Sequence, residues 1–97
     1  RKKYYKLLDE VFESNFWSDG KMTRMFEEKF EEYTGLPSCA VTSGGAGLLS
    51  IFEYIGVRGY DVIVPANTFW ATTQAAKMAG ANIIYADCNK EDLCMKI

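Results

Sequence analysis

Histidine is absent from the 97 residues, and this excludes several kinds of enzyme chemistry. Serine-histidine-aspartate and cysteine-histidine catalysis both need an imidazole as general base. Zinc sites combine histidine and cysteine at close spacing. Cys39, Cys88 and Cys94 are far apart and form no Cys-x-x-Cys motif, so we expect neither a metal site nor a disulfide framework. Three reduced thiols suit a cytoplasmic protein.

Long apolar runs and an excess of positive charge are also missing. No run approaches the roughly 20 apolar residues that span a bilayer, and the start at 1–3 leads into an amphipathic pattern rather than a signal sequence. The formal net charge of −2 and the pI near 5.1 argue against a nucleic-acid or membrane surface. Because the first residue is not Met, we expect a piece of a longer chain.

Two common nucleotide-binding motifs are absent as well. The chain has no Gly-x-x-x-x-Gly-Lys-Ser/Thr, and Gly44–Gly47 do not match Gly-x-Gly-x-x-Gly. Asp87 lies too far from that loop to be the ribose-binding acid of a dinucleotide fold.

What is present begins with two amphipathic helices. Apolar residues at helical spacing predict one helix over residues 3–14 and a second over 22–33. The turn-forming residues of 15–20 separate them, and Gly35 suits the end of the second. Aromatic and methionine side chains at this spacing indicate packing rather than a cofactor site.

Beyond residue 37, strands and helices alternate. We predict strands over Ser38–Thr42, Asp61–Val64 and Asn82–Ala86, helices over Ala46–Ile55 and Phe69–Ala79, and the start of another helix at Asn89–Asp92. This β-α-β-α-β order indicates an α/β fold with a mostly parallel sheet. We therefore divide the chain into an N-terminal helical segment, 1–35, and the first part of an α/β domain, 36–97. Too few helices are present to cover both sheet faces, so the rest of a larger domain is expected elsewhere.

The loop at 43–47 combines small residues with the expected start of a helix. Unpaired N–H groups and the helix dipole favour an anion there, and small residues let it come close. A sharp backbone turn without a ligand explains the pattern equally well. Ligands in such sheets lie beyond the strand carboxyl ends, so 65–70 and 87–89 are expected to meet this loop at one crevice. An anion site beside an aromatic ring suits a flat, phosphorylated ring.

Four segments together resemble the DegT/DnrJ/EryC1/StrS family of pyridoxal-phosphate-dependent sugar aminotransferases, of fold type I. They are Asn15–Gly20 followed by Phe26-Glu27, Thr42–Ala46, Tyr60–Pro65 with Thr68–Thr72, and Ala79–Ala81 with Tyr85–Asp87. The ordered set at matching spacing carries the resemblance over nearly the whole chain.

The resemblance implies a pyridoxal 5′-phosphate site in this chain. Gly45 and Ala46 would bind the cofactor phosphate through backbone N–H groups, and Gly44 would permit its close approach. Phe69 would stack on the pyridine ring, with Trp70 as the competing aromatic residue. Asp87 is expected to be structural. Ser18–Gly20 either line the substrate pocket or form a plain turn.

The sequence departs from the family at two points. Gly45 stands where threonine is usual, so a hydroxyl contact to the phosphate is lost. The lysine that bonds the cofactor and the acid that pairs with its ring nitrogen lie downstream in the family. Lys77, Lys90 and Lys96 do not match that lysine's context, so no catalytic residue is expected here.

The resemblance implies that the parent protein is a homodimeric aminotransferase. It would move an amino group from an amino acid to a keto sugar, and we expect this sugar to be nucleotide-linked. Three alternatives stay open: a cofactor-dependent sugar dehydratase of the same family, a non-catalytic regulatory relative, and an α/β fragment without a ligand. The downstream lysine separates the first two from the aminotransferase.

Overall fold

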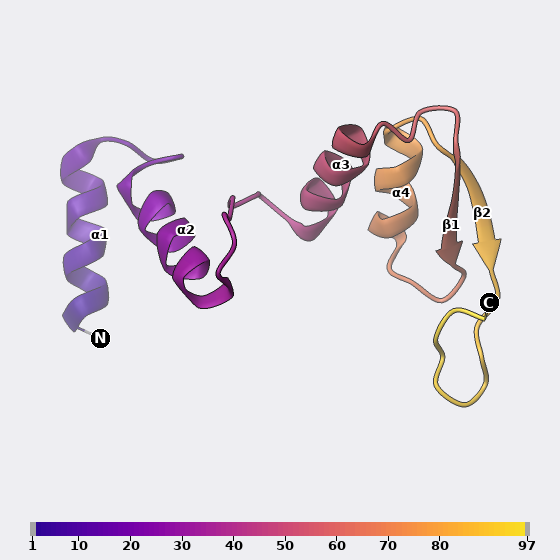
Figure 1. Ribbon diagram of the computed structural model, residues 1–97. Coiled ribbons are helices and arrows are strands. Elements are labelled where there is room, and N and C mark those ends of the chain that lie inside the picture. The colour runs from indigo at the N-terminus through magenta and orange to yellow at the C-terminus, as the bar shows by residue number, and fades with distance from the viewer. Residues whose placement is uncertain (1, 97) are drawn as a thin grey trace. The chain divides into compact units, whose positions relative to one another are not determined.

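A computed structural model describes residues 2–96 of the chain. Its elements in chain order are α1 (Lys2–Ser14), α2 (Lys21–Thr34), α3 (Gly44–Ile55), β1 (Asp61–Pro65), α4 (Trp70–Met78) and β2 (Asn82–Ala86) (Figure 1). The four predicted helices and the last two predicted strands are confirmed, with ends that shift by at most two residues. This is the arrangement of an α/β fragment.

The chain forms two compact units, Arg1–Ala40 and Val41–Ile97. The first holds α1 and α2, and the second holds α3, α4 and both strands. The assignment of residues 1–35 to an N-terminal helical segment and of 36–97 to the first part of an α/β domain stays a prediction.

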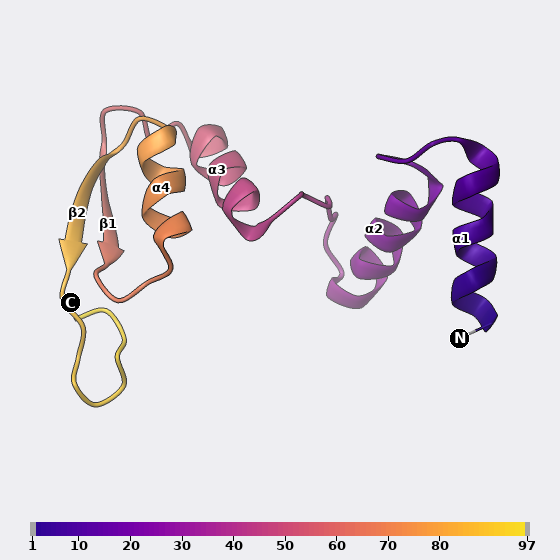
Figure 2. The same ribbon diagram turned by 180° about the vertical axis from the view of Figure 1, so that it is seen from behind.

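In the first unit, a loop formed by residues 15–20 joins α1 to α2 (Figure 2). Asn15 and Asp19 take left-handed backbone angles, with φ of 53° and 50°, which these two residue types tolerate better than most. The Phe12 and Trp17 rings meet edge to face with centroids 5.2 Å apart. Gly35, at φ 74°, ends α2 by donating its N–H to the Glu31 carbonyl, as its predicted role requires.

One ion pair links α1 to α2 and gives the first unit a pH dependence. Lys21 Nζ donates to Glu10 Oε2 at 2.7 Å. This hydrogen bond, then the charge of Lys21 and that of Lys6, lowers the pKa of Glu10 below its ordinary 4.5. A lowered folded-state pKa stabilises the fold above pH 4.5, and the contribution disappears as the pH falls through the lowered value.

We expect Lys21→Gln to return the Glu10 pKa toward 4.5, measured by NMR titration. An unchanged Glu10 titration in this variant would contradict the assignment.

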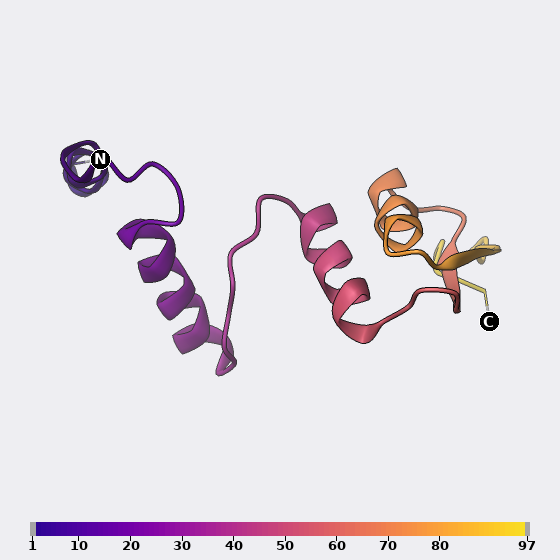
Figure 3. The same ribbon diagram turned by 90° about the horizontal axis from the view of Figure 1, so that it is seen from above.

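In the second unit, α4 lies between α3 and the sheet (Figure 3). The two strands run parallel in register from Asp61↔Asn82 to Pro65↔Ala86. Small residues on α4 let it approach both neighbours closely. The buried core is correspondingly small and consists of Val57, Val64, Ala75, Ala76 and Ala79.

The predicted strand over Ser38–Thr42 is wrong. The structure assigns no strand there, and within residues 2–96 the one ladder joins β1 to β2. A strand needs a neighbour for its N–H and C=O groups. The Ala40 N–H instead donates to the Glu27 carboxylate at 2.7 Å.

The predicted helix start at Asn89–Asp92 is also wrong. The chain turns back on itself so that Cys88 and Met95 form an antiparallel bridge. The Asn89 N–H donates to the Cys94 carbonyl at 2.9 Å, and Leu93 has φ of 58°. Both features close a loop, and a left-handed residue interrupts a helix.

Helix α4 covers one face of the sheet. Ile63 and Ile84 are paired on the opposite face and are 59% and 45% exposed. The strands were predicted to be covered on both faces, and the described residues cover one of these faces.

None of the helices in residues 2–96 has the length and apolar character to cross a membrane.

Candidate functional site

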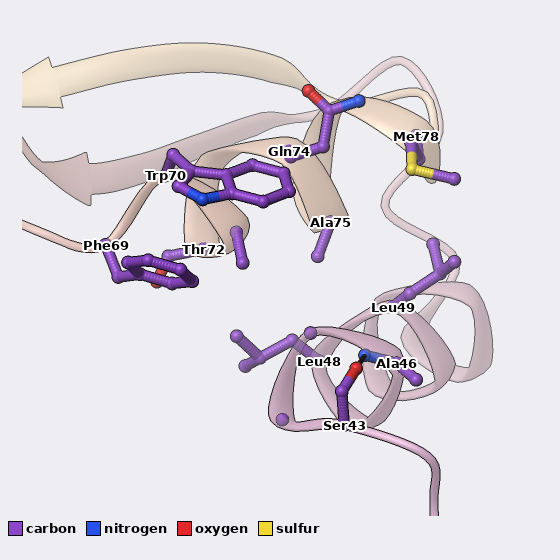
Figure 4. A pocket seen from close by; sticks show the side chains of 13 residues that line it. Ser43, Ala46, Leu48, Leu49, Phe69, Trp70, Thr72, Gln74, Ala75 and Met78 are labelled. Carbon is purple, nitrogen blue, oxygen red and sulfur yellow. Dashed lines mark hydrogen bonds between the residues drawn. The ribbon is translucent and has the colours of Figure 1, made fainter.

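A cavity of about 860 Å³ opens between α3 and α4 (Figure 4). Its walls come from the first half of α3 and from one face of α4 along its length. The lining residues are Ser43, Gly44, Gly45, Ala46, Leu48, Leu49, Phe69, Trp70, Ala71, Thr72, Gln74, Ala75 and Met78. All four predicted cofactor-binding residues are among them, and the prediction that Gly44, Gly45, Ala46 and Phe69 bind a cofactor stays a prediction.

Ser43 caps the start of α3 in two ways. Its extended backbone, φ −164° and ψ 163°, lets the Oγ accept from the Ala46 N–H at 3.1 Å, and its carbonyl accepts from the Gly47 N–H at 3.0 Å. The N–H groups of Gly44 and Gly45 have no acceptor within residues 2–96. Two free amide donors therefore remain at the helix N-terminus.

Space around the glycines decides how a ligand approaches. A Cβ placed on Gly44 would meet no atom within 4 Å, so the backbone there is open. A Cβ on Gly45 would lie 3.4 Å from the Ala71 Cβ, at the contact between α3 and α4. A Cβ at position 45 would therefore make an ordinary van der Waals contact with α4.

Phe69 and Trp70 stand at the start of α4, with ring centroids 5.5 Å apart and planes tilted by 49°. Phe69 is the N-cap residue and has an extended backbone, φ −67° and ψ 136°. The Phe69 ring lies over the space that Leu48 also enters, whereas the Trp70 ring extends along α4 toward Gln74 (Figure 4). Both residues are largely exposed, at 70% and 68%.

The cavity contains no charged side chain. An anion there would be held by neutral donors: the Gly44 and Gly45 amides and the Ser43 hydroxyl. A serine hydroxyl that accepts one hydrogen bond still has a proton to donate. Ser43 can therefore cap the helix and donate to a ligand at the same time.

One expectation about the crevice fails in part. Asp87–Asn89 do not line the cavity, so the described residues bring together two of the three segments expected to meet. Ser18–Gly20 lie in the first unit, where Gly20 lines a different cavity beside Glu10 and Trp17. These residues belong to the turn between α1 and α2, and a role in lining the substrate pocket stays a prediction.

Much of the cavity wall was not predicted from the sequence. Ala71, Gln74, Ala75 and Met78 follow one another at i, i+3, i+4 and i+7, which places them on one face of α4. The same spacing relates Gly45 to Leu48 and Leu49 on α3. This periodicity was the available signal, but from the sequence these positions were assigned to helices and given no role in a cavity.

Comparison with known proteins adds an independent finding. A model of the DegT/DnrJ/EryC1/StrS aminotransferase family matches residues 1–97.

Three curated relatives align over most of the chain. It is 31% identical over 85 residues to a UDP-4-amino-4,6-dideoxy-N-acetyl-beta-L-altrosamine transaminase of Campylobacter jejuni, covering 87% of this chain and 23% of the relative. It is 31% identical over 88 residues to a dTDP-4-dehydro-2,3,6-trideoxy-D-glucose 4-aminotransferase of Saccharopolyspora spinosa, with coverage of 87% and 23%. It is 29% identical over 94 residues to a GDP-4-keto-6-deoxy-D-mannose 3-dehydratase of Yersinia pseudotuberculosis, with coverage of 89% and 24%. The chain thus spans about a quarter of the length of these relatives.

Proposed function

Because the chain belongs to the DegT/DnrJ/EryC1/StrS aminotransferase family, we propose that it supplies part of a pyridoxal-phosphate site in an aminotransferase acting on a nucleotide-linked keto sugar. The family match confirms the resemblance. The transaminases among the relatives support the reaction, and their nucleotide-linked substrates support the substrate class. An amino acid is the proposed amino donor.

The residues of the cavity fit the cofactor. Its phosphate needs hydrogen-bond donors that can be approached closely, and the free amides of Gly44 and Gly45 meet that need. Its flat ring needs an aromatic face, which Phe69 offers at the same cavity. The proposal depends on one observation: two free amides and an aromatic ring line the same cavity.

When bound, pyridoxal phosphate supplies the electron sink for amino-group transfer. The residues of this chain would bind and orient it. The Gly44 and Gly45 N–H groups would hold the phosphate. The Ala46 N–H donates to Ser43 Oγ, so it could bind the phosphate only if the Ser43 hydroxyl turned away. Phe69 would fix the plane of the ring. Apolar residues such as Leu48 and Ala75 would exclude water beside it.

The rest of the catalytic apparatus is proposed to lie outside these residues. None of Lys77, Lys90 and Lys96 lines the cavity, so we propose that the lysine bonding the cofactor is elsewhere in the parent protein. The fold type I large domain, a homodimer and a cytoplasmic location are proposed on the family resemblance alone.

Phe69→Ala in the full-length protein tests the ring contact. Stacking is worth about 0.5–1.5 kcal/mol, so we expect the dissociation constant for pyridoxal phosphate to rise by about twofold to tenfold. Titration followed by the absorbance of bound cofactor measures it. Tyr54→Ala is the control, because Tyr54 is 91% exposed on α3 and does not line the cavity. Equal affinities in the two variants would contradict the role of Phe69.

A dehydratase is the second candidate, because one relative, aligned over 89% of this chain, is a GDP-4-keto-6-deoxy-D-mannose 3-dehydratase. The two reactions are distinguished by their products. A transaminase leaves a keto acid from the amino donor in proportion to the amino sugar formed, whereas a dehydratase releases water from the sugar. The mass of the sugar product formed by the full-length protein therefore separates them, because the transaminase product gains an amino group and the dehydratase product has lost water.

A further inference from the structure

A second, polar cavity of about 360 Å³ lies on the other side of the Trp70–Gln74 edge of α4. We call it the Lys77 pocket. Trp70, Thr73, Gln74 and Lys77 follow one another at i, i+3, i+4 and i+7 and so form one face of the helix. Tyr85 of β2 and the loop after β1, through Thr68, complete the wall. Trp70 and Gln74 line both cavities, so the two are immediate neighbours.

The position of the pocket is that of a ligand site in an α/β sheet. Tyr85 pairs with Val64 one residue before the end of each strand. Val64 is 2% exposed, and both residues face α4 because side chains opposite each other share a face. One end of the pocket, at Tyr85 and Thr68, therefore lies at the carboxyl end of two parallel strands, where such sheets bind ligands, and the other end reaches Lys77 in the last turn of α4.

The chemistry of the wall favours an anion. Lys77 provides its one positive charge, no carboxylate lines it, and within residues 2–96 the Lys77 ammonium takes part in no ion pair. Thr73, Gln74 and Tyr85 add a hydroxyl, an amide and a phenol that can donate hydrogen bonds. Lysine binds phosphoryl oxygens as a point charge, and neutral donors complete such a site.

We infer that the Lys77 pocket binds the diphosphate of a nucleotide-linked sugar, with Trp70 separating it from the cofactor cavity. This rests on the proposed function for the substrate class. Occupation of adjacent cavities would place the sugar end of such a substrate near the cofactor.

The test is calorimetric titration of the full-length, cofactor-loaded protein with UDP, dTDP and GDP, and with uridine as the uncharged probe. For the nucleotide that binds, Lys77→Gln is expected to raise the dissociation constant by about threefold to tenfold and to weaken its dependence on salt. Uridine affinity should not change. Lys90→Gln is the matched control, because Lys90 is exposed in the same unit and does not line the pocket.

Thr73→Val gives a second, uncharged change in the same wall and is expected to weaken nucleotide binding while uridine binding is kept.

Lys77 also lies in the last turn of α4, where a cation stabilises the helix. If Lys77→Gln lowers only the thermal midpoint and leaves nucleotide affinity equal to that of Lys90→Gln, the inference is overturned. It is overturned as well if none of the three nucleotides binds. Cofactor absorbance is measured in parallel: loss of cofactor binding by the parent protein would count against the proposed function, whereas normal cofactor binding with unchanged nucleotide affinity counts against the Lys77 pocket alone.

Discussion

Replacing Gly44 with proline is expected to lower the affinity of the full-length protein for pyridoxal phosphate by about tenfold to a hundredfold while leaving α3 folded. Proline removes one of the two free amide donors, and a hydrogen bond to a charged group is worth about 1.5–3 kcal/mol. The first helical position tolerates proline because its N–H has no partner in the helix. Ser43 is already extended, as a residue before proline must be, and the space beyond Gly44 is open. Spectroscopic titration with the cofactor measures the loss.

Gly44→Ala is the matched control for this prediction. Alanine adds a side chain in the same open space but keeps the N–H group. Any loss of cofactor affinity from the added methyl group is expected to be smaller than the loss from proline, because the donor is kept. If alanine and proline weaken binding equally, a steric effect rather than a lost donor is responsible. If neither weakens it, the phosphate does not bind at the start of α3.

Replacing Gly80 with alanine is expected to lower the free energy of unfolding by about 1–2 kcal/mol. Gly80 links α4 to β2 at φ 85°, a left-handed conformation that is costly for a residue with a Cβ. Its carbonyl accepts from the Gly59 N–H at 2.9 Å, which joins the loops preceding the two strands. Chemical denaturation measures the change.

Steric contact and backbone strain at Gly80 are separable. A Cβ there would lie 3.0 Å from Arg58 Nη1 and 3.1 Å from its Cγ, but this side chain is flexible and can move aside. We therefore expect the loss from Gly80→Ala to persist in an Arg58→Ala background. Gly80→Asn should cost less, because asparagine tolerates the left-handed region. Full recovery of stability in the double variant would assign the loss to steric contact with Arg58.

Local signals predicted most of the fold. The apolar spacing of α1 and α2, with glycine at the end of α2, is a helix pattern that needs no distant partner. Asp61–Pro65 and Asn82–Ala86 are apolar runs bounded by turns, and they pair with each other across one short helix. The glycine loop and Phe69 were recognised because a helix start and an adjacent aromatic ring are local features too.

Features that depend on distant neighbours were not predictable. Ser38–Thr42 reads as a strand, but strand formation requires a paired neighbour, which the described residues do not supply. The capping of Ala46 by Ser43 Oγ depends on a rotamer that the sequence does not specify. The far wall of the cavity, at Ala75 and Met78, depends on α3 packing against α4 rather than against the sheet.

The arrangement of β1, α4 and β2 has a consequence for folding kinetics. These three elements follow one another within residues 61–86, and α4 contacts both strands. Closing so short a segment costs little chain entropy, and local contacts of this kind form early. Helix α3, whose tertiary partner is α4, has a surface to dock on only after that segment has collapsed. The nucleus of the second unit is therefore expected in its C-terminal half, and the glycine loop at the start of α3 would acquire its final geometry late.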